Sequence, residues 1–408
     1  MTISEPLLSD ILDALDLSRA QPGVGFLEAL FTRFNARVPF ESATKILRNA
    51  EVGDPSEKPR TPEVFWADHL ERGAGGTCFA RVAAFDALLS ALGFATRRVL
   101  GRVERDGDHA ALLVSSAGGE TIADVGFPLP ALLPARPSSV ETPLAELRVD
   151  ATGRGLCVRL LGGVPEGPRS IEIFEAPVSE ETYLALWRGT FQPRSRFLEE
   201  VVLRHDLGSR VVSFASGEIR VDDLHSRLRV PLIGSRPSAL SELFGVEMEL
   251  LERAFEIVGD PPPESKDATL SAYLETEASP AEAFAAIASR EGYERLLRGV
   301  ADIVAREETP TGFRLALSAS ADTSETSVEE DVAIDSEALR LAIVRKSGAS
   351  AFRSSYRAQE RAGRTFLIRE AVLSGAREDL LRNDSLRGRL AGTLAVDLLA
   401  WGRMLGTS

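Results

Sequence analysis

The first part of this chain is organised around the segment Arg72-Gly-Ala-Gly-Gly-Thr-Cys78-Phe-Ala-Arg-Val-Ala-Ala-Phe-Asp-Ala-Leu-Leu-Ser-Ala-Leu-Gly93. Its apolar residues recur at i, i+3 and i+4, which predicts a helix ending at Gly93. The glycines before Cys78 allow a sharp turn and a close approach of substrate to the backbone. Cys78 then lies in the first helical turn, where unpaired N–H groups and the helix dipole favour a thiolate. The alternative is that Cys78 is a small buried residue of a tight turn.

Beyond Gly93 the apolar period changes from 3.6 to 2, which predicts three antiparallel strands joined by turns at 106–107 and 118–119. The second strand begins at His109 and the third ends near Asp124. Side chains on neighbouring antiparallel strands can lie about 5 Å apart at Cβ. Asp124 could then orient His109, whose other ring nitrogen faces Cys78. The sequence therefore predicts a Cys-His-Asp catalytic triad; otherwise His109 begins a strand and Asp124 a turn.

The composition is that of a globular protein. The chain has 408 residues, of which 44% are hydrophobic and 26% charged, so two or three domains are expected. The net charge of −14 argues against nucleic acid and anionic membranes as partners. No apolar run could span a membrane and no signal peptide is evident, so we expect a cytoplasmic protein with free thiols at Cys78 and Cys157. The four histidines are scattered, so neither a metal site nor a bound cofactor is expected.

The triple proline in the segment 259–265 predicts a linker between residues 1–258 and 266–408. Within the first part we expect helices over 1–93, a β-barrel over 94–177 and a mixed third part over 178–258. Three further expectations are a strand at 198–202, one helix at 240–258 and a terminal helix from about 376 to 404. His69 is expected on a helix, partly exposed.

The first part resembles the arylamine N-acetyltransferase family over roughly residues 5–258. Four motifs carry the resemblance: Val38-Pro-Phe40-Glu41, Gly75-Gly-Thr-Cys78-Phe, His109-Ala-Ala-Leu-Leu-Val and Asp124-Val-Gly-Phe127. It implies a cysteine-protease-like fold made of a helical bundle, a β-barrel and a third α/β part. This chain departs from the family pattern at Ala74, where the family usually has arginine; the nearest arginine is Arg72.

The resemblance also implies an activity. Cys78 would be acetylated by acetyl-CoA and pass the acyl group to a small-molecule amine, with His109 as base and Asp124 as its orienting acid. Residues of the matching motifs would contact substrate or CoA: Phe40, Gly75, Gly76, Thr77, Gly126 and Phe127.

Residues 266–408 resemble the START-like, or polyketide cyclase-like, helix-grip fold in the order of their expected elements. That fold implies a hydrophobic ligand held between a curved sheet and the last helix, whereas a packed core without a cavity is the alternative. The whole chain is thus expected to be α+β.

Two other functions are compatible with the sequence. One is a transglutaminase-like cysteine hydrolase or amidase that does not use CoA. The other is an inactive acyltransferase fold joined to a domain that binds a hydrophobic ligand. Cys157 is expected to have no catalytic role because it lies within a strand between apolar residues.

Overall fold

The computed structural model describes residues 3–116, 118–127, 129–161, 170–195, 197–259, 262–298, 301–318, 328–347, 350–361, 363–375, 377 and 379–406. They form two units. Of the described residues, those within 3–161, 170–224 and 232–264 belong to the first unit, and those within 225–231 and 265–406 belong to the second. Part of the expected linker, residues 260–261, lies outside the described residues, as does Ala376, the expected start of the last helix.

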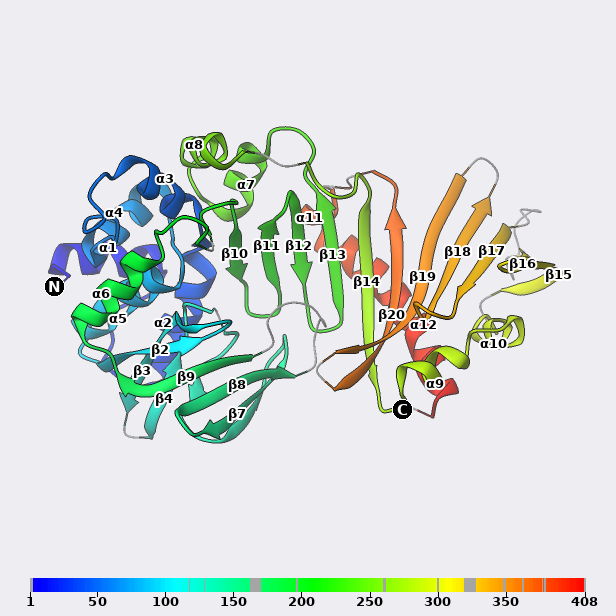
Figure 1. Ribbon diagram of the computed structural model, residues 1–408, viewed down its shortest axis with the longest axis horizontal. Coiled ribbons are helices and arrows are strands. Elements are labelled where there is room, and N and C mark those ends of the chain that lie inside the picture. The colour runs from blue at the N-terminus through cyan, green and yellow to red at the C-terminus, as the bar shows by residue number, and fades with distance from the viewer. Residues whose placement is uncertain are drawn as a thin grey trace. The chain divides into compact units, whose positions relative to one another are not determined.

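The first unit begins with five helices: α1 (Glu5–Ala14), α2 (Val24–Arg37), α3 (Ala43–Glu51), α4 (Pro62–Arg72) and α5 (Cys78–Ala91). The periodic residues of α5 form the centre of this bundle: Val82, Phe85, Leu88 and Leu89 are completely buried. On one side α5 contacts α4, and on the other it contacts the first two strands of the following sheet (Figure 1). Because α5 is covered on both sides, its position is fixed by the packing of the whole unit.

That sheet has eight strands: β2 (Ala95–Arg102), β3 (Asp106–Ser116), β4 (Gly119–Ala123), β5 (Leu133–Pro134), β6 (Ser138–Glu141), β7 (Glu146–Thr152), β8 (Gly155–Leu161) and β9 (Ser170–Pro177). Their order is β5-β4-β3-β2-β9-β8-β7-β6, and the two end strands contact each other, so the sheet is nearly closed into a barrel. The residues of β3 alternate between two cores: Leu112 and Val114 face the helices, while Ala111 and Leu113 face the barrel interior.

The third part of the first unit combines α6 (Glu180–Gly189), α7 (Arg236–Phe244) and α8 (Met248–Val258) with the antiparallel strands β1 (Phe40–Glu41), β10 (Leu203–Asp206), β11 (Val211–Ala215) and β12 (Glu218–Asp222). The short strand β1 pairs with β10, which ties residues near the start of the chain to residues far along it. The helices α7 and α8 contact each other, and α8 also packs on α3.

The second unit contains an antiparallel sheet in the order β13-β14-β20-β19-β18-β17-β16-β15. These strands are β13 (Ser226–Pro231), β14 (Ala268–Thr276), β15 (Asp302–Thr309), β16 (Gly312–Ser318), β17 (Val328–Asp335), β18 (Arg340–Ser347), β19 (Ser350–Arg361) and β20 (Arg364–Leu373). Strand β13 precedes the proline-rich segment in sequence, yet it pairs with β14 and so joins this unit. Backbone pairing therefore decides its place, which the position of the prolines could not reveal.

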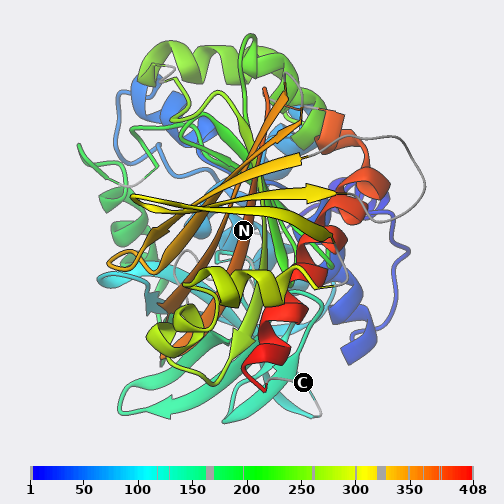
Figure 2. The ribbon, with the colours of Figure 1, turned by 90° about the vertical axis from the view of Figure 1, so that its right-hand side faces the viewer.

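Four helices complete the second unit: α9 (Pro280–Ala285), α10 (Arg290–Leu296), α11 (Asp379–Arg382) and α12 (Asp384–Met404). Ser279 caps α9, because its hydroxyl accepts from Glu282 N while the Glu282 carboxylate accepts from Ser279 N. The long helix α12 crosses one face of the sheet and contacts β14 and β20 (Figure 2). Its buried apolar residues are Leu394, Leu398 and Trp401.

Three sequence-based expectations about elements were wrong. Residues 198–202 form no strand; Ser42 Oγ instead donates to Glu200 O at 2.8 Å and accepts from Val202 N at 2.8 Å. The helix expected over 240–258 is divided into α7 and α8, because Gly245 adopts a left-handed conformation with φ of 68°. The last helix starts at Asp384, where the Asn383 side chain caps Leu386 N at 2.9 Å. In each case a side chain or a glycine ends a pattern that hydrophobic periodicity alone would continue.

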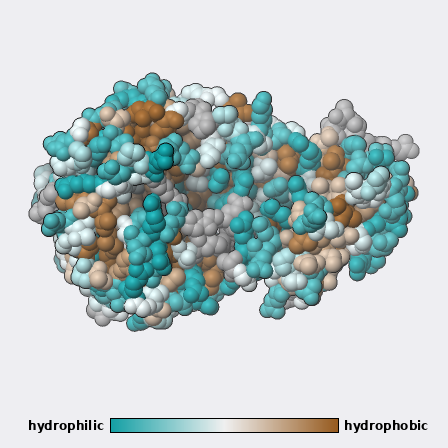
Figure 3. Space-filling view, in the orientation of Figure 1, coloured by the Kyte–Doolittle hydropathy of each residue, from teal (hydrophilic) through white to brown (hydrophobic). Residues whose placement is uncertain are grey.

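No helix of the described part is long and apolar enough to cross a membrane. On the face that Figure 3 shows, hydrophobic residues form separate patches among hydrophilic ones.

Candidate active site

Cys78 is the first residue of α5, at the end of a turn that is held by backbone pairing. Gly76 N donates to Pro39 O at 3.3 Å, and Glu41 N donates to Gly76 O at 3.2 Å. Gly75 is required here, since a Cβ at this position would lie 1.8 Å from Pro39 O. The glycines before the cysteine therefore allow the turn to lie against the segment that carries Phe40.

His109 lies on β3 and Asp124 directly follows β4, so the two residues meet across the hairpin that these strands form. His109 Nε2 donates to Asp124 Oδ2 at 2.7 Å, and both side chains are buried. The register pairs Ala123 with Leu112, so Asp124 is diagonal to His109 rather than directly opposite it. The second carboxylate oxygen, Oδ1, accepts from Gly126 N at 2.9 Å and Phe127 N at 2.8 Å. The turn after β4 therefore fixes the Asp124 carboxylate, which in turn fixes the His109 ring.

The third member of the predicted triad, Cys78, lies close enough to His109 to raise the pKa of the imidazole. The Asp124 contact occupies Nε2 of the ring, and the Cys78 thiol donates to Asp108 O, next to His109 in the chain, at 3.9 Å. Gly126 lies directly against the cysteine, because a Cβ there would be 2.9 Å from Cys78 Cβ. The structure thus brings Cys78, His109 and Asp124 to one site.

The pKa of His109 reflects two opposing influences. Burial lowers it, but the negative charge of Asp124 and hydrogen bonds with Asp124 and Cys78 outweigh burial and raise the pKa from 6.5 to about 10. The raised pKa favours an imidazolium next to Cys78, which is the partner that a thiolate nucleophile needs.

The remaining predicted site residues surround the triad. Phe127 is half-buried and its ring centroid lies 6.3 Å from that of His109. Phe40 is paired with Gly76, and its ring lies 5.2 Å from that of Phe197. Thr77 is the buried residue that precedes α5. The other cysteine, Cys157, lies on β8 and is a free thiol.

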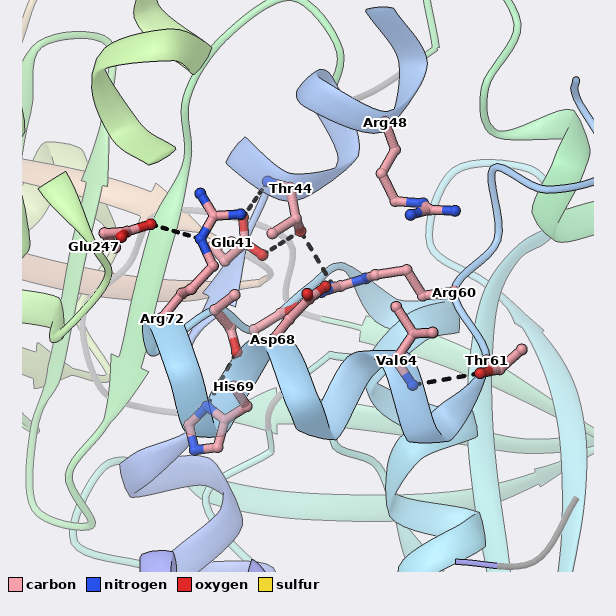
Figure 4. A network of polar contacts seen from close by, with 12 residues as sticks. Glu41, Thr44, Arg48, Arg60, Thr61, Val64, Asp68, His69, Arg72 and Glu247 are labelled. Carbon is pink, nitrogen blue, oxygen red and sulfur yellow. Dashed lines mark hydrogen bonds and ion pairs between the residues drawn. The ribbon is translucent and has the colours of Figure 1, made fainter. Parts of the chain in front are cut away.

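Arg60 supports the turn before Cys78, whereas Arg72, the arginine nearest to Ala74 in sequence, makes a different contact. Arg60 donates to Gly75 O and to Thr44 Oγ1, and its other terminal nitrogen pairs with Asp68 at 2.9 Å (Figure 4). Arg72 instead pairs with Glu247 at 2.5 Å. Proximity in sequence was misleading because the buried guanidinium comes from the loop before α4, and no local pattern distinguishes Arg60 from other loop arginines.

A second buried guanidinium, that of Arg81, joins three segments. Arg81 Nε donates to Val125 O at 2.7 Å, and the two terminal nitrogens donate to Val38 O and to Asn35 Oδ1. Burial lowers the pKa of Arg81 to about 9. One side chain on α5 thus holds the end of α2 and the turn that contains Asp124. The only sequence signal was a charged residue inside an apolar helical stretch.

Lys45, on α3, is a buried cation that the sequence analysis missed. Burial lowers its pKa from 10.5 to about 8, against the attraction of a negative charge on Cys78. Its Nζ lies 5.6 Å from the centroid of the Phe191 ring, a cation–π contact. Lys45 therefore contributes to the electrostatic environment of the cysteine.

His69 is buried, contrary to the expectation that it is partly exposed. Its Nδ1 donates to Ala74 O at 3.0 Å, within the turn that leads to Cys78 (Figure 4). Burial, reinforced by the charges of Arg81 and Arg60, lowers the pKa of His69 to about 4. His205, which is half-buried, has its pKa lowered to about 4 by the loss of solvent around its ring. The exposure of His69 is decided by tertiary packing, because a position on a helix does not determine whether the side chain faces the core or the solvent.

These two histidines make the fold sensitive to acid. Between pH 6.5 and about 4 the unfolded chain binds protons that the folded chain does not, so stability falls as the pH falls through this window. Each histidine contributes at most roughly 3 kcal/mol. We expect His69→Gln, which keeps a donor for Ala74 O but cannot titrate, to flatten the dependence. Urea unfolding of the full chain across this range checks it. The exposed His225 provides the control, His225→Gln; equal slopes for both variants would contradict the assignment.

The comparisons with known proteins concern this unit. Residues 24–154 match the model of the N-acetyltransferase family. The arylamine N-acetyltransferase from Salmonella typhimurium is 19% identical, with a TM-score of 0.53 over 62% of this chain and 99% of that chain. The M. tuberculosis enzyme is 21% identical, with a TM-score of 0.52 over 61% of this chain and 99% of that chain. The first unit has the arylamine N-acetyltransferase fold.

A further structure with this N-acetyltransferase fold is the Mycobacterium marinum arylamine N-acetyltransferase in complex with CoA, at 20% identity and a TM-score of 0.53 over 62% of this chain and 99% of that chain. No curated protein sequence matches this chain. Within the described ranges, no group of three or more His, Cys, Asp and Glu residues could hold a metal ion.

Proposed function

We propose that the first unit is an acyltransferase that moves an acetyl or other acyl group from acyl-CoA to an amine through a thioester on Cys78. The observation that carries this proposal is the buried His109 ring, which is held by its hydrogen bond to Asp124 and lies close to Cys78 at the start of α5. The matching family model and the fold shared with a CoA-bound enzyme support CoA as the donor.

The reaction has two halves. In the first, the Cys78 thiolate attacks the acyl carbonyl, the bond from carbonyl carbon to CoA sulfur breaks, and CoA leaves as a thiol with a proton from His109. In the second, the amine attacks the Cys78 thioester, the carbon–sulfur bond breaks, and the amine proton passes to His109. The amide product leaves and the thiolate–imidazolium pair is restored. Asp124 holds the ring throughout and stabilises its positive charge.

Acetyl-CoA alone tests the first half. After incubation, the intact protein is expected to gain the mass of one acetyl group, removable with hydroxylamine as thioesters are. Cys78→Ala is expected to gain none, whereas the matched control Cys157→Ala gains the adduct like the wild type. Absence of the adduct, together with no CoA release in the presence of any arylamine, would overturn the acyltransferase. Activity of the wild type on amides without CoA would favour the cysteine hydrolase.

For the second unit we propose the helix-grip fold and a hydrophobic ligand. The sheet order, the two short helices between β14 and β15, and α12 across the sheet support the fold. The interior contains the rings of Tyr293, Tyr356 and Trp401 and the buried Arg369, which pairs with Asp397 at 3.0 Å. A ligand there would need a polar group beside its apolar part. Cytoplasmic residence is part of the same proposal.

A further inference from the structure

The sheet of the second unit carries a pair of arginines whose charges face each other. Arg340 on β18 is directly opposite Arg357 on β19 in the register. Like charges in directly opposite positions of antiparallel strands are destabilising. A negative charge close to both guanidiniums would therefore stabilise this pair.

Two other cross-strand arginines of this sheet are matched by acids, and Arg364, which is opposite Arg361, pairs with Glu275. Arg314 is opposite Asp331 and pairs with it at 2.5 Å, and Glu330 is opposite Arg345 and pairs with its guanidinium. Within the described ranges, neither Arg340 nor Arg357 has a carboxylate within ion-pair distance. Asp335 is opposite Arg340, but its Oδ1 accepts from Glu337 N at 3.1 Å and Ala338 N at 2.9 Å. The turn after β17 thus engages one oxygen of the Asp335 carboxylate.

The same two arginines line a pocket of about 100 Å³ together with Ser355, Ile368 and Glu370. Three adjacent strands supply these residues, and the register places Ser355 opposite Glu370 and Arg357 opposite Ile368. The volume of this pocket is about three times the roughly 30 Å³ that a water molecule occupies in the liquid. It is well below the roughly 300 Å³ at which pockets for drug-sized ligands begin. It suits a single carboxylate or phosphate group.

We propose that this pocket binds the oxyanion group, carboxylate or phosphate, of a small molecule. The Arg340 and Arg357 guanidiniums would donate to its oxygens, as paired arginines do in carboxylate and phosphate recognition. Glu370, which accepts from Ser271 Oγ at 3.2 Å, lies at the far side of the pocket. Its carboxylate would accept a hydrogen bond from a donor on the same ligand, which favours molecules that carry an ammonium or hydroxyl group next to the oxyanion. The site is independent of Cys78 and of acyl transfer.

Inorganic phosphate and acetate are the two probes, titrated into the full chain by calorimetry at low ionic strength. We expect saturable binding of at least one of them. Arg340→Gln and Arg357→Gln are each expected to weaken binding at least tenfold. The matched control is Arg353→Gln, since Arg353 is on the same strand and the same face, four residues from Arg357, but pairs with Asp267 at 2.6 Å.

Thermal unfolding gives a second readout that a purely structural role would not produce. Without an anion, Arg357→Gln is expected to melt at or above the wild-type temperature, because it removes a like-charge repulsion. At saturating anion the order is expected to reverse, because only the wild type gains stability by binding.

A comparison of glycine with acetate then tests Glu370: glycine should bind more tightly to the wild type, and Glu370→Gln should remove that advantage. No saturable binding of either probe, or equal binding by Arg357→Gln and Arg353→Gln, would overturn the proposal.

Discussion

Asp124→Asn is expected to lower the rate of acyl transfer roughly 10³- to 10⁴-fold while leaving the fold intact. Oδ1 of Asp124 accepts from two backbone N–H groups, Gly126 N and Phe127 N, so in the variant this atom must remain an oxygen. The amide NH₂ then takes the place of Oδ2 and donates to His109 Nε2. His109 is forced into the tautomer that carries its proton on Nδ1, and it can no longer accept a proton from Cys78.

The same substitution changes the pH dependence. The negative charge of Asp124 is what raises the pKa of His109 to about 10 against burial. In the wild type, the folded pKa lies above the unfolded value of 6.5, so the stabilisation by the charged ring is fully present below pH 6.5 and is lost as the pH rises towards 10. Asp124→Asn should remove this high-pH loss, because burial then keeps the ring neutral.

Single-turnover acetyl transfer measures the first effect, and urea unfolding of the full chain at a series of pH values between 6.5 and 10 measures the second. Asp106→Asn is the matched control, because Asp106 is an exposed residue at the start of β3 that pairs with Arg154. Asp106→Asn should behave like the wild type. Transfer by Asp124→Asn within tenfold of the wild-type rate would contradict the role proposed for Asp124.

Arg81→Met is expected to lower the free energy of unfolding by about 3 kcal/mol or more. The guanidinium donates to three acceptors, Val125 O, Val38 O and Asn35 Oδ1, in a completely buried position. Methionine fills much of the volume but leaves these acceptors without their donor. Loss of the bond to Val125 O also frees the turn that orients Asp124, so activity should fall together with stability.

Urea unfolding of the first unit, followed by tryptophan fluorescence, measures the change. Arg97→Met is the control: Arg97 pairs with Glu120 at 2.7 Å on a partly exposed surface, and such pairs contribute about 1 kcal/mol or less. If Arg81→Met and Arg97→Met unfold at the same urea concentration, Arg81 does not hold the three segments together.

The sequence was informative where one local pattern determines one element. Apolar residues at helical spacing located α5, and the change to a period of 2 located β3 and β4, because burial of one face requires that periodicity. His109 and Asp124 could be paired in advance because a tight turn fixes which strand residues come together. Even there the pairing is diagonal, since the register depends on where β4 ends.

Elements were mispredicted where a distant residue or a single glycine overrides the apolar pattern. Residues 198–202 contain apolar side chains suited to a strand, but Ser42 binds their backbone groups. A single helix over 240–258 fits the apolar periodicity, but Gly245 allows a left-handed turn that no other residue type adopts as easily. Periodicity reports which face is buried, and does not report where the backbone stops being helical.

The Gly75-Gly76-Thr77-Cys78 turn shows how the two sources of information differ. The sequence alone determined that a cysteine begins a helix and that a histidine and an aspartate follow on neighbouring strands, because turns, caps and periodicity are local. Only the tertiary structure decided that Arg60 and His69 hold this turn and that Arg81 joins it to the Asp124 turn. These three side chains are polar groups whose burial depends on acceptors in other segments, and no spacing along the chain encodes where those acceptors lie.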